Sequence, residues 1–154
     1  MSSFRIPRRE VEARILLEGG EEVAGRLFAP RHGPHGERGT IEDRLSDARE
    51  PFLPLVREGD TLFVSADWIL SVTLPAEDAH LAEGDDAHTF ELTLRLAGGS
   101  EIRGTVGISL PPEESRPLDF LNAAPRFIAV RSESAVVLVN RAFVVSASET
   151  DRSA

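Results

Sequence analysis

The chain has 154 residues, with 17 basic and 26 acidic side chains and a formal net charge of −9. This length suffices for one compact domain or two very small ones and is too short for a large multidomain enzyme. The negative charge argues against generic binding to nucleic acids or anionic membranes, which attract clustered positive charge. Because the sequence has no cysteine, disulfides, thiolate nucleophiles and Cys-ligated zinc are excluded, and an apolar core must stabilise the fold.

The N-terminal residues 1–10 lack the apolar run of a signal peptide, and no stretch of the chain reaches the length of a membrane span. We therefore expect a cytoplasmic protein without membrane contact. Arg5, Arg8 and Arg9 make this segment a basic arm, which we expect to pair with the protein's own acidic surface or with a partner.

An internal repeat organises the rest of the chain. Residues 11–27 recur as residues 90–106 at an offset of 79, and residues 52–71 recur without gaps as residues 127–146 at an offset of 75. The positions of the first block that are identical in its second copy are Glu12, Leu17, Gly19, Gly20, Glu22 and Gly25. Matching order, turn and spacing favour a duplication over chance similarity.

The first strand of each copy alternates between apolar and more polar residues with a period of two, which predicts a strand with one face on a core. Gly19-Gly20 and its second copy predict a tight two-residue hairpin turn, because glycine accepts positive φ angles. Gly25 and Gly104 lie inside the returning strands and predict a bulge or a sharp bend. The remaining strands are expected at residues 52–56, 61–65 and 68–74 and at residues 127–130, 135–139 and 143–148.

Five strands per copy predict an all-β fold of two tandem five-stranded small barrels packed together, with one fused β-sandwich as the alternative. The expected organisation is a basic arm (1–10), a first repeat (11–74), an acidic linker (75–89), a second repeat (90–148) and a tail (149–154). The formal charges of residues 1–74, 75–89 and 90–154 are −3, −5 and −1, so more than half of the net charge lies on the linker.

The connections from the second to the third strand differ between the copies. Residues 29–47 are rich in glycine and proline and predict a loop, with a helical turn at residues 45–47. In residues 111–122 we expect one helical turn whose Leu118 and Leu121 face inward.

Two features predict contact surfaces. The run of residues 135–139 has no polar alternation, so we expect this strand to be buried on both faces, against the other repeat or another subunit. Trp68 and Phe143 open the last strand of each copy, where core packing is the usual role and exposure marks a protein interface.

The hairpin pattern apolar-x-Leu-x-x-Gly-x-x-apolar-x-Gly-x-apolar, at residues 15–27 and again in the second copy, resembles the first motif of Sm-like small β-barrels. SH3-like barrels have similar hairpins. Residues 118–122 and 127–130 also resemble pieces of an uncharacterised group of bacterial proteins. The resemblance implies two Sm-like or SH3-like repeats.

Sm-like proteins that bind RNA carry Asp and Asn before the third strand and an Arg-Gly pair near the fourth. Asp119 and Asn122 resemble the former, and Arg141 lies near the fourth strand, but the Arg-Gly pair is absent. RNA binding through Arg103, Arg126, Arg131 and Arg141 is therefore the alternative, and the resemblance favours the architecture over that activity.

Catalytic chemistry has little support in the sequence. His32 and His35, with Glu37 nearby, could bind zinc or nickel, but their Gly/Pro-rich segment favours a solvated loop, and a metal-dependent activity is the second alternative. No serine-nucleophile motif, tyrosine or cysteine is present. We expect no catalytic residue, cofactor or metal.

These observations predict a non-enzymatic protein-interaction module, a bacterial adaptor, scaffold or regulatory protein. The candidate partner-binding residues are Trp68, Phe143, Asp119, Asn122 and Arg141. We expect a protein partner, with a homo-oligomer as one form of it, and regard nucleic acid as an unlikely one.

Overall fold

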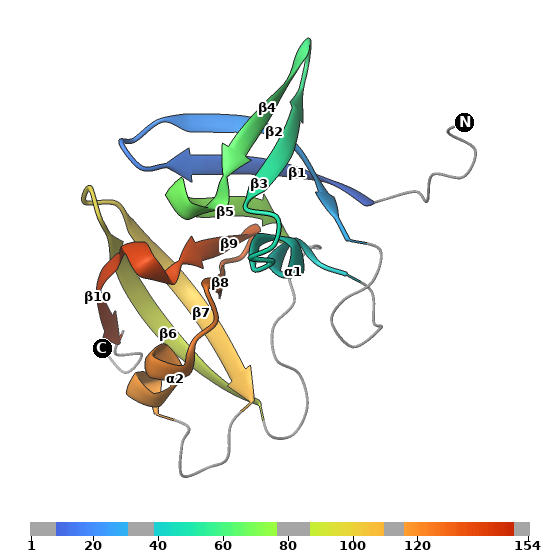
Figure 1. Cartoon of the computed structure of the whole chain (residues 1–154). Coiled ribbons are helices and arrows are strands. Elements are labelled where there is room, and N and C mark those ends of the chain that lie inside the picture. The colour runs from blue at the N-terminus through green and yellow to red at the C-terminus, as the bar shows by residue number, and fades with distance from the viewer. Residues whose placement is uncertain (1–8, 31–38, 77–86, 110–115, 150–154) are drawn as a thin grey trace.

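A computed structural model describes residues 9–30, 39–76, 87–109 and 116–149 (Figure 1). Among them the fold is predominantly β, as the sequence predicts, with ten strands in one antiparallel sheet and two short helices. The first repeat contains β1 (Arg9–Leu17), β2 (Glu22–Ala29), α1 (Ile41–Leu45), β3 (Phe52–Arg57), β4 (Asp60–Ser65) and β5 (Ile69–Pro75). The second contains β6 (Ala87–Leu96), β7 (Glu101–Ser109), α2 (Pro117–Ala123), β8 (Phe127–Arg131), β9 (Ala135–Asn140) and β10 (Val144–Glu149).

The two repeats follow one another within the same sheet. The strand order is β10-β6-β7-β8-β9-β5-β1-β2-β3-β4, so each repeat has its last strand beside its first, and β9 joins β5 antiparallel across the boundary. This order leaves β10 at one end of the sheet and β4 at the other (Figure 1).

Strand pairing is the same in both repeats. Phe52 lies opposite Ser65 in the first, and their counterparts Phe127 and Asn140 lie opposite each other in the second. The start of the last strand is also held in the same way in both repeats. Glu18 N–H donates to the Trp68 carbonyl at 2.9 Å in the first repeat, and Ala97 N–H donates to the Phe143 carbonyl at 2.9 Å in the second. The aligned sequence blocks therefore fold into equivalent structures.

The glycine pair of the first hairpin differs in detail from the prediction. Gly19 and Gly20 have the predicted positive φ angles, 98° and 94°. The turn has three residues rather than two, because Leu17 N–H donates to the Glu21 carbonyl across residues 18–20. Gly20 N–H also donates to the Leu17 carbonyl, which places Gly19 at the third position of a turn, where positive φ is required.

Gly25 and Gly104 allow strands to cross closely. The register of β1 with β2 continues past Gly25 without a shift, so the predicted bulge is absent. A Cβ atom on Gly25 would lie 2.6 Å from the Val56 carbonyl oxygen, and one on Gly104 would lie 2.4 Å from that of Arg131. The glycines therefore let β3 and β8 pass over β2 and β7 at backbone distance.

Two apolar clusters form the core, and they do not divide at the repeat boundary. The first contains the inward side chains of β1–β5 and α1 together with Phe127, Val136 and Leu138 from the second repeat. The second contains inward side chains of β6–β9 and α2 together with Leu70 from the first repeat. Each repeat therefore completes the core of the other.

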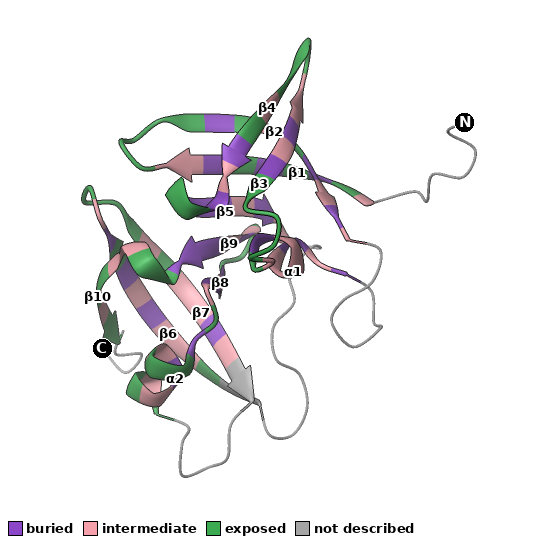
Figure 2. Ribbon diagram, viewed as in Figure 1, coloured by how far each residue is buried: buried purple, intermediate pink, exposed green. Residues whose placement is uncertain are grey.

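Strand β9 confirms the prediction of a strand buried on both faces: four of its six residues are buried and the other two are of intermediate burial (Figure 2). It lies between β8 and β5. Val136 and Leu138 belong to the first cluster, whereas Val139 belongs to the second.

Several predicted boundaries shift. Strand β6 begins at Ala87, inside the predicted linker, and β1 begins at Arg9, inside the predicted basic arm. Strand β10 extends to Glu149, and Trp68 and Phe143 end short 3₁₀ turns instead of opening the strands. The remainder of the basic arm lies outside the described residues.

The helices also depart from the prediction. Helix α1 begins four residues before the predicted turn at residues 45–47 and overlaps it only at Leu45. Thr40 starts the helix: its hydroxyl accepts from Asp43 N–H while the Asp43 carboxylate accepts from Thr40 N–H. In α2, Leu118 is exposed and Phe120 is the buried residue, with Leu121 partly buried. The inward placement of Leu118 was therefore wrong. Among the described residues, no helix is long and apolar enough to cross a membrane.

Candidate functional site

The boundary between the repeats is a strand-to-strand joint with polar contacts at one end. Strands β5 and β9 pair from Ser71 opposite Val139 to Pro75 opposite Ala135. The buried Asn140 side chain donates to the Ile69 carbonyl at 2.9 Å and accepts from Ala142 N–H at 3.0 Å. A buried amide with both ends bonded fixes the register, because a shifted strand would leave it unsatisfied.

An ion pair lies at the same end of the joint. The Arg126 guanidinium donates to the Asp67 carboxylate of the other repeat and lies 5.8 Å from the centre of the Phe127 ring. Because Asp67 is largely exposed, this pair contributes less than the apolar contacts around it.

The apolar part of the joint comes from the outer face of the β8–β9 hairpin. Phe127 and Leu138 are each 1% exposed and pack into the first core cluster. The first repeat contributes Leu70 of β5, which is 4% exposed and packs into the second cluster. Burial of three such side chains makes this joint a major source of stability.

The equivalent positions at the two ends of the sheet are exposed. Phe52 and Phe63 correspond to Phe127 and Leu138, and they are 58% and 69% exposed. Pro54, which pairs with Phe63, lies on the same face. We name Phe52, Pro54 and Phe63 the β4 edge surface. Phe63 lies on the edge strand and Phe52 on β3 next to it, and an apolar patch with two exposed aromatic rings at a sheet edge is typical of an interaction site.

The opposite end of the sheet carries one large exposed apolar side chain. Val145 of β10 corresponds to Leu70 and is 65% exposed. Its neighbours Ser146 and Ser148 are exposed as well. We name Val145, Ser146 and Ser148 the β10 edge surface.

The tip of the β3–β4 hairpin is held by a local ion pair. Arg57 and Asp60 meet at 2.6 Å around Gly59, whose φ is 94°. The side-chain hydrogen bond from Arg57 lowers the pKa of the Asp60 carboxyl. Both groups of the pair are therefore ionised at neutral pH, and the pair spans the tip of the hairpin beside the β4 edge surface.

The predicted aromatic candidates have different surroundings. Trp68 is 59% exposed, as an interface residue would be, whereas its counterpart Phe143 is partly buried against the second core cluster. Trp68 lies next to Asp67 of the inter-repeat ion pair, so it adjoins the joint.

The three polar candidates do not form one site. Asp119 pairs with Arg116 at 2.8 Å, and this hydrogen bond lowers the pKa of its carboxyl. Asn122 is exposed on α2, and the Arg141 guanidinium donates to the Ala124 carbonyl. Asp119 and Arg141 thus have structural partners at the beginning and after the end of α2.

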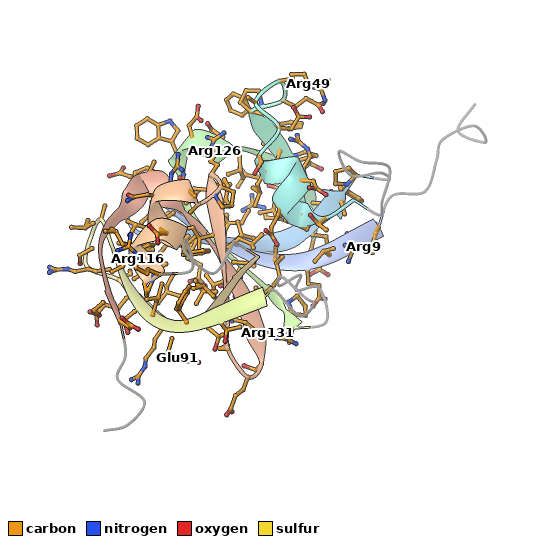
Figure 3. All side chains as sticks on the ribbon, turned by 90° about the horizontal axis from the view of Figure 1, so that it is seen from below. Arg9, Arg49, Glu91, Arg116, Arg126 and Arg131 are labelled. Carbon is orange, nitrogen blue, oxygen red and sulfur yellow. The ribbon has the colours of Figure 1, made fainter. Side chains whose placement is uncertain are left out.

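The arginines of the RNA-binding alternative are dispersed. Arg126 and Arg131 lie at opposite ends of β8 (Figure 3), and Arg126 is engaged with Asp67. Arg103 is exposed on β7. His32 and His35 lie outside the described residues; within these, no group of three or more His, Cys, Asp or Glu could hold a metal ion.

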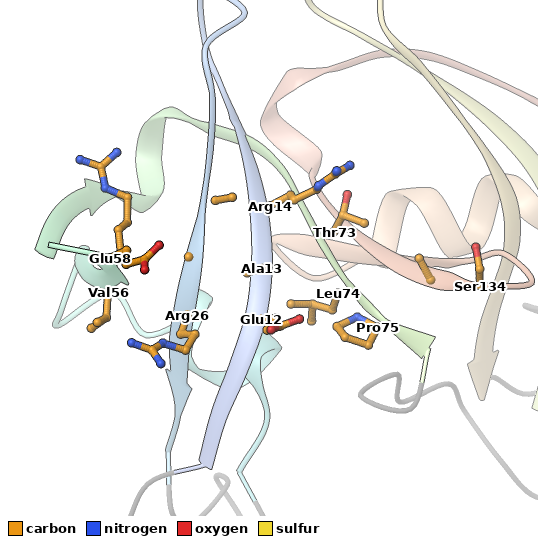
Figure 4. Close-up of a pocket in the computed structure, with 14 residues that line it drawn as sticks. Glu12, Ala13, Arg14, Arg26, Val56, Glu58, Thr73, Leu74, Pro75 and Ser134 are labelled. Carbon is orange, nitrogen blue, oxygen red and sulfur yellow. The ribbon is translucent and has the colours of Figure 1, made fainter. Parts of the chain in front are cut away.

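A groove of about 860 Å³ runs across the outer side of β1, β2 and the start of the joint (Figure 4). Its charged lining residues are Arg14, Arg26 and Arg57 together with Glu12 and Glu58. Because both signs of charge occur along it, the groove favours neither an anionic nor a cationic ligand.

Sequence reasoning missed Phe52, Phe63 and Val145. The available signal was the alignment of the copies, since Phe52 and Phe63 match residues of the buried β8–β9 hairpin. No family model, curated protein or solved structure matches the chain in the comparisons with known proteins.

Proposed function

We propose that the chain is a non-enzymatic protein-interaction module, an adaptor, scaffold or regulatory protein, that binds its partner at the β4 edge surface. In this proposal the two repeats are Sm-like or SH3-like barrels held together by the β5–β9 joint. The observation that carries the proposal is the exposure of Phe52 and Phe63, 58% and 69%, beside a terminal strand.

The edge of β4 supports the proposal through its backbone. Within the described part of the sheet, β4 pairs with β3 on one side and with no strand on the other. Its outward N–H and C=O groups are therefore available to a strand of a partner, which is a common mode of peptide and protein recognition.

The side chains add binding energy to that backbone pairing. Aromatic rings supply a large share of the free energy of association in protein interfaces, because each buries a large apolar area. A partner that pairs with β4 and covers Phe52 and Phe63 would gain both contributions.

A photo-crosslinking experiment tests this function. Benzoylphenylalanine replaces Phe63 in the full chain, which is irradiated in its host cells, and adducts are identified by mass spectrometry. We expect a protein adduct that is lost when Phe52→Asp is added. The same probe at Leu118, which is 60% exposed on α2, is the matched control. Absence of a protein adduct, or an adduct with RNA alone, would refute the proposal.

A further inference from the structure

The backbone groups on the free edge of β4 can be assigned from its pairing with β3. Ala66, the residue after β4, donates its N–H to the Pro51 carbonyl at 2.8 Å, so it faces β3. Successive residues of a strand direct their N–H and C=O groups to opposite sides, so the residues that face β3 alternate with residues that face away from it. The residues of β4 that face the free edge are therefore Thr61, Phe63 and Ser65.

A proline in β3 supports this assignment independently. Pro54 lies opposite Phe63 in the register of the two strands. Because proline has no N–H, this pair cannot exchange the two hydrogen bonds of a hydrogen-bonded pair. The N–H and C=O groups of Phe63 therefore point away from β3, toward the free edge.

The free backbone groups are symmetric about Phe63, because Thr61 and Ser65 lie two residues before and after it. We consider two copies of β4 side by side and antiparallel, with Phe63 of one copy opposite Phe63 of the other. Thr61 of each copy then lies opposite Ser65 of the other copy. Each free N–H and C=O group of these residues meets a free group of the second copy. The edge of β4 is thus complementary to itself.

The outer faces of the two copies join into one apolar row in this arrangement. Pro54 and Phe63 lie side by side on the outer face of each copy. The two Phe63 rings, each 69% exposed in the single chain, become cross-strand neighbours at the twofold axis. Phe52, which is 58% exposed, flanks the row in each copy. Pairing therefore covers the β4 edge surfaces of both copies with each other.

Charge and shape are compatible with this pairing. In the same register Asp60 of one copy lies opposite Ala66 of the other, so the acidic residue of β4 does not face its own kind. Asp60 is already paired with Arg57 of its own hairpin. The tip of the β3–β4 hairpin projects beyond the neighbouring strands (Figure 1), which leaves space beside β4.

The opposite end of the sheet offers a poorer match to the β4 edge surface. The β10 edge surface has one large apolar side chain, Val145, and the exposed hydroxyl residues Ser146 and Ser148. Removal of aromatic rings from water is favourable when the covering surface is apolar as well. A second β4 edge surface therefore covers Phe52 and Phe63 better than the β10 edge surface does.

From these observations we infer that the partner of the β4 edge surface is the β4 edge surface of a second copy of this chain. The inference rests on the proposed function and names its partner. The two copies are related by a twofold axis at Phe63. Because each copy uses the same surface, the assembly closes at a dimer and leaves both β10 edges free. The paired surface is small, so association is reversible and depends on protein concentration.

Cysteine variants test the register directly, since the sequence contains no cysteine. In Phe63→Cys the two thiols lie at the twofold axis, with Cα atoms about 5.5 Å apart, a separation that suits a disulfide. We expect mild oxidation of the full-length variant to give a covalent dimer in non-reducing electrophoresis. Leu118→Cys, at a position of α2 that is 60% exposed, is the matched control and should remain monomeric.

Two further cysteine variants check the pairing on either side of the axis. In Thr61→Cys alone or Ser65→Cys alone, the two thiols lie about 14 Å apart, which is too far for a disulfide. An equimolar mixture places one thiol of each kind opposite the other, so we expect cross-linking only in the mixture. A disulfide yield of Phe63→Cys no higher than that of Leu118→Cys would overturn the inference, and so would efficient self-cross-linking of Thr61→Cys.

Sedimentation velocity measures association without a cross-link. Wild type should change from monomer to dimer as its concentration rises. Phe63→Asp places two carboxylates at the axis and should raise the dissociation constant at least about tenfold. Val145→Asp, at a position of the other edge that is 65% exposed, should leave it unchanged. Both positions are exposed, so both variants are expected to keep the wild-type circular dichroism spectrum.

The assembly itself can contradict the inference in three ways. A wild-type chain that stays monomeric at every concentration would overturn it, as would species larger than a dimer. Loss of the dimer in Val145→Asp would assign the contact to the β10 edge instead. A monomeric wild type whose benzoylphenylalanine probe at position 63 cross-links to a different protein would leave the proposed function intact and refute only the second copy as partner.

Discussion

The outer faces of the β3–β4 and β8–β9 hairpins have the same strand register and opposite environments. Phe127 and Leu138 are buried in the first core cluster, whereas Phe52 and Phe63 are exposed. The two hairpins differ in their neighbours, since β9 has β5 beside it and β4 ends the sheet. The comparison shows that burial of these side chains is decided by the adjoining strand rather than by the hairpin itself.

Removal of the aromatic ring at the start of each hairpin should give the largest difference in stability between the two hairpins. Phe127→Ala removes a ring from a closed core and should lower the free energy of unfolding by about 3–5 kcal/mol. Phe52→Ala removes an exposed ring and should change it by less than about 0.5 kcal/mol. Urea unfolding of the two variants and of the wild type measures both values. Equal losses would contradict the assigned difference in burial.

The polar residues at the ends of β9 and β4 provide a second, smaller contrast. Asn140→Ala leaves the Ile69 carbonyl without the buried amide donor and should cost about 1–3 kcal/mol. Ser65→Ala, at the equivalent position of the free edge, is expected to be close to neutral in the same unfolding measurement. A large decrease in the free energy of unfolding from Ser65→Ala would mean that the side chain of Ser65 stabilises the chain, contrary to the assignment of a free edge.

The helices of the two repeats differ in their response to pH. Burial, assisted by the charge of Asp43, raises the pKa of the Glu42 carboxyl from 4.5 to about 7. Between these values the folded chain binds more protons at Glu42 than the unfolded chain, so the free energy of unfolding falls as pH rises from about 4.5 to 7. Glu42→Gln should remove this slope and stabilise the chain at pH 8 by about 1–2 kcal/mol.

Asp119 of α2 is the matched control for Glu42. Its pKa is lowered by the hydrogen bond from Arg116, so its contribution to stability is present above the unfolded pKa and is lost as pH falls. At pH 8, Asp119→Asn should therefore lower the melting temperature slightly, opposite in sign to Glu42→Gln. Melting curves recorded from pH 4 to pH 8 distinguish the two, and a shared sign would contradict the assignment.

Much of the fold was predictable because the sequence signals for the strands are local and occur in both repeats. Alternation of apolar residues and the repeat alignment located the strands, and the unbroken apolar run of residues 135–139 predicted a strand buried on both faces. The start of α1 was misplaced, although its capping pair of Thr40 with Asp43 is local in the sequence. In α2 the position of the helix was predicted but its buried face was not, because the burial of Phe120 depends on how the helix packs on the sheet.

The candidate site was less predictable than the strands. Trp68 was identified by its residue type and is exposed, but Phe143 at the equivalent position is partly buried. Exposure of Phe52 and Phe63 depends on β4 ending the sheet, which follows from the long-range pairing of β5 with β9. Sequence spacing alone does not determine which of two equivalent edges remains free.

The sharing of core residues between repeats has a consequence for synthesis of the chain. The first core cluster needs Phe127, Val136 and Leu138, which are translated after every strand of the first repeat. A nascent chain that has released only residues 1–76 from the ribosome therefore exposes apolar surface where β9 will pack. The core of the N-terminal half is therefore completed only after residue 138 has emerged, and its folding depends on synthesis of the C-terminal half.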